Sequence, residues 1–283
     1  MRVGRLSQAI RICRALLLVV PPLLAGCGGD DVAWTDPMSL PVGDANARLR
    51  VDARGRVRLV PDTSVSVIPA HDSTACAGSV RVVRLDDGTL AGVWWSVRPD
   101  SSADLLTSLS PDGGASWRPA VRIDTADVSV VGCNRPPPAV AASAGFVHIA
   151  YTMRASEGAG VFYAHSMNAG KTYEPAVTIL YGDRLTSTAI AAEKGTVAVA
   201  YEDPNGSTPQ IGLAISRDWG HIFPQRIRGS TGIGAATFPD VAIAGREIAV
   251  TWLVGPTGGE GAGGGESHSE TRVTRIVRVG RLQ

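Results

Sequence analysis

Short runs in which apolar residues alternate with small or polar ones recur through most of the chain, and each run ends at a glycine or a charged turn. Between residues 139 and 180 this two-residue period predicts four strands, near Ala139–Ala142, Phe146–Thr152, Gly160–Ser166 and Ala176–Leu180. No convincing amphipathic helix follows residue 26. The pattern therefore predicts an all-β fold.

Two marks repeat along the chain with one period of about fifty residues. The first is an octapeptide that reads SPDGGASW from Ser110, SMNAGKTY from Ser166 and SRDWGHIF from Ser216, at intervals of 56 and 50 residues. The second is an apolar run that ends on an aromatic residue, at Trp95, Tyr151, Tyr201 and Trp252. Because both marks share the interval, we expect a small β-propeller of four-stranded blades.

The octapeptide resembles the Asp-box, or BNR repeat, of sialidases and related propellers. The resemblance implies a structural turn between the third and fourth strands of a blade, on the face away from the ligand site. In such a turn Asp112 accepts backbone N–H groups, Gly114 adopts a backbone conformation closed to other residues, and Trp117 packs between blades. The structural positions are Ser110, Asp112, Gly114, Trp117, Ser166, Asn168, Gly170, Tyr173, Ser216, Asp218, Gly220 and Phe223. An alternative hypothesis makes Asp112 or Asp218 a catalytic acid.

The number of blades stays open between four and five. Four units are visible from Cys76 onward, and the fourth has the glycine-rich stretch 255–270 in place of an octapeptide. Before them, residues 47–60 have the pattern of a hairpin with its turn near Asp52–Gly55. We expect this hairpin to pair with the C-terminal strands, because a closed ring leaves no exposed sheet edge.

The N-terminus has the pattern of a targeting segment, with four arginines followed by the apolar run Ala15–Ala25. The sequence Leu24-Ala25-Gly26-Cys27 comes next and resembles a bacterial lipobox. We expect a signal peptide at 1–26, lipid on Cys27, a tether at 27–44 and the propeller at 45–283. Since Gly28 stands where an aspartate would signal inner-membrane retention, the lipoprotein resemblance implies an envelope protein, on the outer membrane if the organism has one, facing the periplasm or the exterior. The alternative is an ordinary secretory signal with a chance cysteine.

Four cysteines occur in the chain. If Cys13 leaves with the signal and Cys27 carries lipid, Cys76 and Cys133 remain as a pair in an oxidising compartment, and we expect them to form a disulfide. Two separate buried thiols are the alternative.

The net charge and the histidine positions bear on whether the chain binds nucleic acid or a metal ion. The chain has 27 basic and 26 acidic residues, a net charge of +1, which gives no basic field for nucleic acid. Its five histidines show no metal-ligand spacing, and His148 and His165 fall inside predicted strands, where packing is expected. No metal or other cofactor is predicted.

If the octapeptides mark the bottom of the propeller, the loops between second and third strands lie on top, together with the connections between blades. The polar residues of these loops are His71, Asp72, Arg98, Asp100, Asn134, Arg135, Arg154, Glu157, Arg184, Glu202 and Asp203. The ligand-binding candidates among them are His71, Asp72, Arg98, Arg135, Arg154, Arg184, Glu202 and Asp203. The structural alternative for each is a solvated loop charge.

A sialidase needs an arginine cluster that binds the substrate carboxylate, and a tyrosine nucleophile with a nearby glutamate. The Phe-Arg-Ile-Pro sequence typical of that family near its first blade is missing here, and the nearest match, Asn134-Arg135-Pro136, lies in a later unit. Tyr201 precedes Glu202, but successive strand residues point to opposite sides. The sequence therefore favours a membrane-anchored lipoprotein that binds a glycan or protein through its top face. An exo-α-sialidase or related exo-glycosidase acting on an anionic sugar is the enzymatic alternative, and an envelope assembly or scaffold protein is the third.

Overall fold

The computed structural model describes residues 32–43, 47–61, 72–232, 234–255 and 273–283. These residues form nineteen strands and one 3-10 turn, η1 (Ala77–Ser79), with no α-helix among them. The predicted all-β fold class is confirmed. Within the described ranges, no helix is long and apolar enough to cross a membrane.

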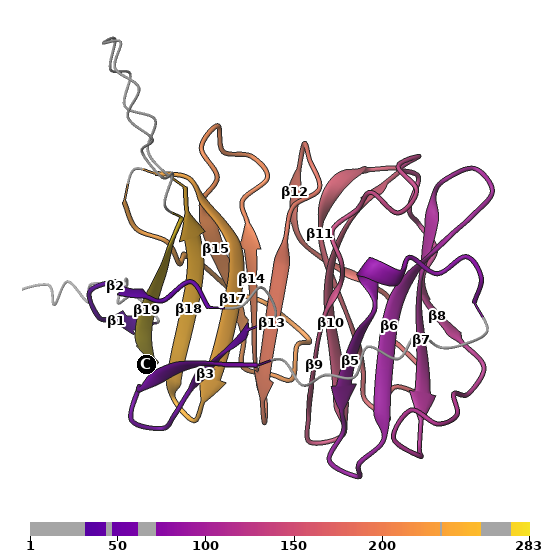
Figure 1. The fold of residues 1–283 in the computed structure, drawn as a ribbon, viewed down its shortest axis with the longest axis horizontal. Helices are drawn as coiled ribbons and strands as arrows, with labels where there is room; N and C mark the ends of the chain where they lie inside the picture. The colour runs from indigo at the N-terminus through magenta and orange to yellow at the C-terminus, as the bar shows by residue number, and fades with distance from the viewer. Residues whose placement is uncertain (1–31, 44–46, 62–71, 233, 256–272) are drawn as a thin grey trace, which may run out of the picture. The chain divides into compact units, whose positions relative to one another are not determined.

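Three sheets are complete antiparallel blades in which the strands pair in chain order (Figure 1). Blade 1 contains β5 (Arg81–Arg84), β6 (Leu90–Val97), β7 (Ala103–Ser110) and β8 (Val121–Asp124). Blade 2 contains β9 (Ala139–Ser143), β10 (Phe146–Ala155), β11 (Gly158–Ser166) and β12 (Val177–Gly182). Blade 3 contains β13 (Thr188–Glu193), β14 (Thr196–Glu202), β15 (Ile211–Ser216) and β16 (Gln225–Arg228). The four strands predicted between residues 139 and 180 are those of blade 2.

Blade 4 combines both ends of the described chain. Its first three strands are β17 (Ala236–Ala244), β18 (Glu247–Val254) and β19 (Thr274–Leu282), and its fourth place holds β1 (Val32–Trp34) and β2 (Met38–Leu40). Val32 pairs with Leu282 and Met38 with Val277. Residues 32–40 fall within the predicted tether, but here they cover an edge that β19 would otherwise expose.

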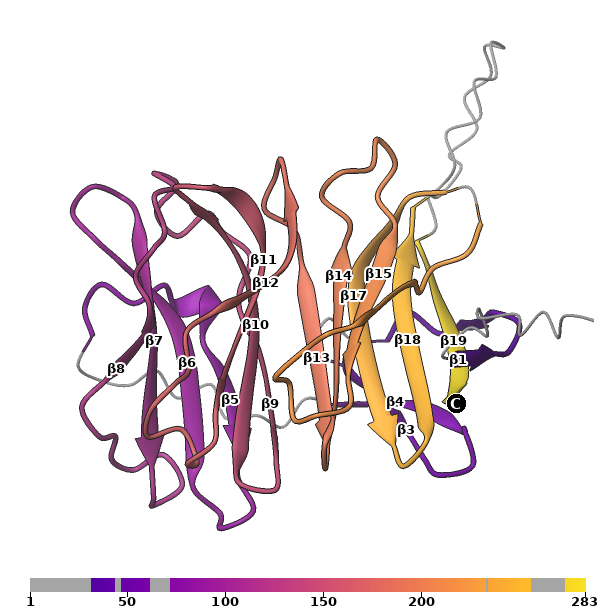
Figure 2. The ribbon, with the colours of Figure 1, turned by 180° about the vertical axis from the view of Figure 1, so that it is seen from behind.

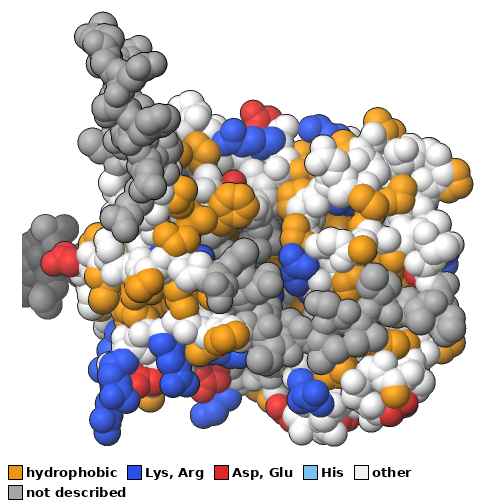
Figure 3. All heavy atoms as spheres, viewed as in Figure 1, with side chains coloured by type: hydrophobic (Ala, Val, Ile, Leu, Met, Phe, Trp, Pro, Cys, Tyr) orange, Lys and Arg blue, Asp and Glu red, His pale blue; other side chains and the backbone are white. Residues whose placement is uncertain are grey.

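The hairpin of β3 (Ala47–Val51) and β4 (Val57–Pro61) forms a separate two-stranded sheet (Figure 2). The prediction that it pairs with the C-terminal strands is wrong, because β1 and β2 occupy that edge. Its apolar side packs on blade 4 instead, where Leu49 is buried against Ala249 and Val279. Figure 3 shows Lys and Arg side chains gathered over the hairpin, at the lower left. The described chain therefore has four blades and one additional hairpin.

The blades lie side by side through their first strands. β5 contacts β9, β9 contacts β13, β13 contacts β17, and β17 contacts β3. Large side chains fill the space between successive sheets, including Trp95 and Tyr151 between blades 1 and 2, Tyr163 between blades 2 and 3, and Trp252 between blades 3 and 4. This radial order of four-stranded sheets is that of a β-propeller.

Each of the three octapeptides forms the same kind of turn, between the third and fourth strands of its blade. The Ser110 hydroxyl donates to Asp112 Oδ1 and accepts Gly114 N–H, and Asp112 Oδ1 also accepts Ser116 N–H, each at 2.8 Å. The copies from Ser166 and Ser216 repeat these bonds. Hydrogen bonds from Ser116 and Ser110 lower the pKa of Asp112 to about 2.

The aromatic residue of the octapeptide packs on the preceding blade in two of the three copies. The Tyr173 hydroxyl lies 3.4 Å from Thr107 Oγ1 of blade 1, and the Phe223 ring centroid lies 4.8 Å from that of Tyr163 in blade 2. Trp117, expected between blades, instead covers Gly92 of its own sheet, since no four-stranded blade precedes blade 1.

Blade 4 has no turn of this kind in its described part, because its fourth strand comes from β1 and β2. The glycine-rich stretch joins β18 to β19, which are the second and third strands, so it does not replace an octapeptide turn. Residues 256–272, most of that stretch, lie outside the described residues.

Candidate functional site

The candidate residues belong to the end of the sheets opposite the octapeptide turns, which we call the top face. Its described loops join second to third strands and fourth strands to the next blade, at residues 98–102, 125–138, 156–157, 183–187, 203–210, 229–232 and 234–235. His71 lies outside the described residues.

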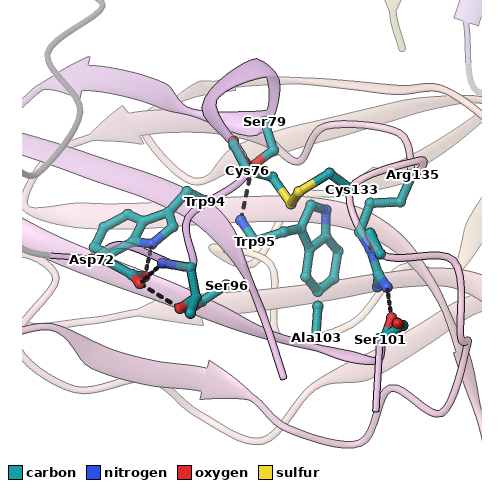
Figure 4. Close-up of a disulfide and its surroundings, with 12 residues drawn as sticks. Asp72, Cys76, Ser79, Trp94, Trp95, Ser96, Ser101, Ala103, Cys133 and Arg135 are labelled. Atoms are coloured by element: carbon teal, nitrogen blue, oxygen red, sulfur yellow. Dashed lines mark hydrogen bonds between the residues drawn. A yellow bond between two sulfur atoms is a disulfide. The ribbon is translucent and has the colours of Figure 1, made fainter. Parts of the chain in front are cut away.

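The predicted disulfide is present on this face and joins Cys76 to Cys133, with their Cα atoms 5.4 Å apart (Figure 4). It connects the segment before β5 with the loop between β8 and β9. Trp95 lies beside it, with its backbone N–H donating to Ser79 Oγ and its indole N–H to Pro136 O at 3.0 Å. The bridge therefore fixes the two segments that lead into the first strands of blades 1 and 2.

Arg135 is part of this buried cluster, and its guanidinium is bonded to groups within the protein. Its guanidinium forms an ion pair with Asp127 at 2.7 Å, and both side chains are buried, at 0% and 1% exposure. It also donates to Gly132 O at 2.6 Å and lies 5.3 Å from the centroid of the Trp95 ring. Arg135 therefore holds the 125–138 loop together and has no side-chain surface for a ligand.

Asp127, which the sequence analysis does not single out, is the centre of that loop. Burial alone would raise the pKa of this carboxyl, but hydrogen bonds from Ser129 and Arg135 outweigh burial and lower it. Its oxygens accept hydrogen bonds from the Ala103 N–H at 3.0 Å and from the Ser129 hydroxyl at 2.6 Å. The Asp-Val-Ser order is the one sequence signal, since an aspartate two residues before a serine favours a local turn.

The other three arginines hold neighbouring loops and do not converge on one point. Arg98 donates to the carbonyls of Thr125 and Asp127. The guanidinium of Arg154 donates to Asp183 O at 3.2 Å, and that of Arg184 to Gly206 O at 2.8 Å. Within the described top face, these residues and Arg135 form no common carboxylate clamp.

The aspartates among the candidates also have structural partners. Asp72 accepts the indole N–H of Trp94 at 2.7 Å and Thr74 N–H at 2.9 Å. Burial opposes ionisation of Asp72, but hydrogen bonds from Thr74, Trp94 and Ser96 lower its pKa. Asp203 accepts Asn205 N–H at 2.9 Å, which fixes the turn after β14.

Tyr201 and Glu202 point to opposite sides of β14, as their adjacency predicts. Tyr201 packs on Gly212 of its own sheet and belongs to the core between blades 2 and 3, where burial raises its pKa. Glu202 faces blade 4, where its carboxylate accepts Phe238 N–H at 2.8 Å. The pair therefore cannot act as nucleophile and base on one substrate.

Phe238 is the residue of this face that the sequence analysis missed. It lies in the bulge of β17 between Thr237 and Asp240, has a left-handed backbone (φ +52°) and is 62% exposed. A bulky residue in that conformation is strained by about 1–2 kcal/mol. The exposure and left-handed backbone of Phe238 are evident only in the fold. The one sequence sign is Pro239 within a strand, which weakly indicates a bulge.

Glu202 is bonded to the Phe238 backbone, and Arg184 lies close enough to Glu202 for its charge to act on that carboxyl. Burial raises the pKa of Glu202, while Phe238 N–H and the charge of Arg184 oppose that rise. The three residues come from the top ends of β14 and β17 and from the loop before β13. They bring a half-buried carboxylate to the backbone of an exposed aromatic residue, with a cation acting on that carboxylate.

Comparisons with known proteins return fold-level similarity only. No protein-family model matches the chain, and no curated protein does. Among solved structures, the chain is similar to the Hadza microbial sialidase Hz136 (17% identity, TM-score 0.45, covering 62% of this chain and 41% of that one). It is also similar to Trypanosoma rangeli sialidase in complex with the inhibitor DANA (11% identity, TM-score 0.46, covering 77% and 39%).

A third similar structure is the α-L-arabinofuranosidase PaAbf62A from Podospora anserina in complex with cellotriose (8% identity, TM-score 0.41, covering 87% and 96%). The chain spans about two fifths of the length of the two sialidases. Because these TM-scores are below 0.5, the propeller fold rests on the strand order and contacts of the chain itself.

Proposed function

We propose that this protein is a lipid-anchored component of the cell envelope whose propeller binds a glycan through the top face, at Phe238, Glu202 and Arg184. The observation that carries the proposal is the exposure of Phe238 in a strained conformation that Glu202 fixes. Backbone strain clusters at ligand sites, where the surrounding structure maintains it.

The chemistry of the three side chains suits a sugar. A sugar ring has an apolar C–H face that stacks on an aromatic ring, and hydroxyl groups around its edge that bond carboxylates and guanidiniums. The backbone that carries the ring is already fixed by Glu202, so that part of the site loses little conformational freedom on binding. The enzymatic alternative has less support, because the arginines of the described top face hold separate loops and Tyr201 points away from Glu202.

Binding of the Cys27→Ser protein to a panel of immobilised glycans tests this site. We expect Phe238→Ala to weaken binding of the recognised glycan about tenfold or more, with an unchanged unfolding midpoint. Val130→Ala is the matched control, since Val130 is an exposed apolar residue of the top face (73% exposed) outside this cluster. Equal binding by wild type and Phe238→Ala would remove Phe238 from the site, and binding only to proteins would replace the glycan with a protein ligand.

Two further measurements test the alternatives. Hydrolysis of a fluorogenic sialoside that disappears in Arg184→Ala would establish the exo-sialidase alternative in place of a binding role. For the anchor, mass spectrometry of the N-terminal peptide should find acyl chains on Cys27, and Cys27→Ser should release the protein from the membrane fraction. An unmodified Cys27 in an exported chain would establish the ordinary secretory signal.

A further inference from the structure

The β3–β4 hairpin has one apolar and one basic side. Leu49, Val51, Val57 and Leu59 belong to the apolar cluster on blade 4. The alternation of strand residues places Arg48, Arg50 and Arg58 on the opposite side. The hairpin therefore turns a row of guanidiniums away from the sheet on which it packs.

Two of these arginines face each other across the hairpin. Arg50 pairs directly with Arg58 in the strand register, and both side chains are exposed. Like charges directly opposite on one face of a sheet destabilise the pairing. Asp52, the acid in the hairpin turn, is already engaged with Arg54 N–H at 2.9 Å and with Arg56 N–H at 3.0 Å. The arginine pair thus has a cost in folding that no described contact explains.

The hairpin borders a cavity of about 550 Å³ at the centre of the propeller, mainly through β3, with Arg48 and Arg50 of its basic side and Leu49 and Val51 of its apolar side in the lining. The first strands of all four blades complete its walls, at residues 82–84, 140–142, 190–192 and 240–243. Three arginines (Arg48, Arg50 and Arg84) line it, against one described acid, Asp240.

Asp240 offsets part of this charge, because the charge of Arg48 acts on its carboxyl, and Arg50 and Arg84 remain. Its oxygens accept the backbone N–H groups of Leu49 at 2.7 Å and of Val241 at 2.9 Å. Those bonds hold the hairpin against β17. The described lining of the cavity therefore has an excess of positive charge in a space of the size that small ligands occupy.

We propose that this cavity binds a small molecule through an oxyanion group, a carboxylate, sulfate or phosphate. Guanidinium groups form paired hydrogen bonds with such groups. Arg50 of β3 and Arg84 of β5 both line the cavity, and one Nη of Arg84 also donates to Gly88 O at 3.0 Å. A bound oxyanion at Arg50 also weakens the repulsion between Arg50 and Arg58. None of the top-face residues Phe238, Glu202 and Arg184 lines this cavity. The proposed oxyanion site and the proposed glycan site can therefore be tested independently.

Thermal unfolding of the Cys27→Ser protein with inorganic phosphate, sulfate and glucuronate tests the site, with sodium chloride at matched ionic strength and glucose as references. We expect the oxyanions to raise the midpoint in a saturable way beyond chloride, with no effect of glucose. Phosphate and sulfate against glucuronate distinguish the inorganic-type oxyanions from a sugar acid as the source of the group.

Arg50→Gln and Arg84→Gln should each weaken the oxyanion affinity about fivefold or more. Arg118→Gln is the matched control, because Arg118 is exposed directly after the octapeptide of blade 1 and does not line the cavity. Without ligand, Arg50→Gln should keep or raise the unfolding midpoint, whereas a purely structural arginine would lower it when replaced. Phe238→Ala should leave oxyanion binding unchanged.

The proposal is overturned if phosphate acts no more strongly than chloride, or if Arg118→Gln weakens binding as much as the cavity variants do. Binding to anionic phosphatidylglycerol vesicles that phosphate does not compete away would reassign the arginines to a membrane surface. Arg84 lies on β5, outside the hairpin. If Arg50→Gln does not fold, the affinity of Arg84→Gln for the oxyanion still tests the proposal.

Discussion

Left-handed backbone occurs in every octapeptide turn, but the space beside it differs from one glycine to the next. Gly113 and Gly220 both have positive φ angles, of +72° and +89°. Around Gly113 a Cβ atom would meet nothing within 4 Å, whereas on Gly220 it would lie 1.8 Å from the Tyr163 hydroxyl. The position of Gly113 is occupied by Ala169 and Trp219 in the other copies, so a side chain is tolerated there.

Replacement of these two glycines by alanine should therefore have unequal effects. We expect Gly113→Ala to lower the free energy of unfolding by about 1 kcal/mol, the cost of a left-handed alanine. Gly220→Ala should cost about 3 kcal/mol or more, because strain adds to the clash with Tyr163. Urea denaturation of both variants measures the difference, and equal midpoints would contradict the packing of this turn against blade 2.

Arg135 allows a second test at the scale of single residues. Its replacement by alanine leaves the buried Asp127 without its cation, and we expect a loss of about 3–5 kcal/mol in unfolding free energy. Arg154→Ala, at an exposed arginine of the same face, should change that free energy by less than about 0.5 kcal/mol. If Arg135→Ala is as stable as Arg154→Ala, the ion pair with Asp127 is not formed.

A buried histidine pair occupies the contact between neighbouring elements β10 and β11. His148 and His165 are 0% and 4% exposed, and their Nε2 atoms have no hydrogen-bond partner among the described residues. His148 Nδ1 bonds the Tyr163 hydroxyl at 2.7 Å. Burial, with a smaller contribution from the charge of His165, lowers the pKa of His148 to about 3.

The free energy of unfolding should therefore decrease as the pH is lowered from about 6.5 toward 3. Between the unfolded pKa of about 6.5 and the folded value of about 3, the unfolded chain binds a proton at this histidine that the folded chain does not. The contribution is complete above pH 6.5 and is lost as the pH falls toward 3, by about 2–3 kcal/mol at pH 4.5.

Urea midpoints at several pH values measure this slope, with His148→Phe as the comparison. The variant should show a shallower loss between pH 6.5 and 4.5, whatever its stability at neutral pH. An identical slope in both proteins would mean that His148 is protonated as readily in the folded as in the unfolded state.

At the scale of the whole molecule, Cys76 and Cys133 close a loop of 57 residues that includes all of blade 1. Such a bridge stabilises a fold chiefly by restricting the unfolded chain, and a loop of this length corresponds to about 4 kcal/mol in that model. We expect reduction to lower the free energy of unfolding by about 2–4 kcal/mol. The Cys76→Ser, Cys133→Ser double variant should be destabilised similarly and should no longer respond to reductant, while an unchanged midpoint after reduction would contradict the account.

The sequence anticipated much of the fold because its signals are local and repeated. The two-residue period located the strands of blade 2, and the octapeptide located the turn between third and fourth strands in three blades. The candidate site was less predictable. Charge and loop position selected Arg135 correctly as a residue of the top face, but burial against Asp127 and Trp95 depends on residues far apart in the chain.

By itself, the sequence determined the all-β class, the blade repeat, the shared turn and the cysteine pair. The first three depend on hydrogen bonds and on residue alternation within a few positions of the chain, and the cysteine pair followed from counting the cysteines that remain. Only the tertiary structure decided that β1 and β2 complete blade 4, that the hairpin stands apart beside a basic cavity, and that Phe238 is exposed. Those outcomes depend on which sheet edge and which apolar surface remain for each segment to cover, and pairing between distant segments leaves little trace in a local pattern.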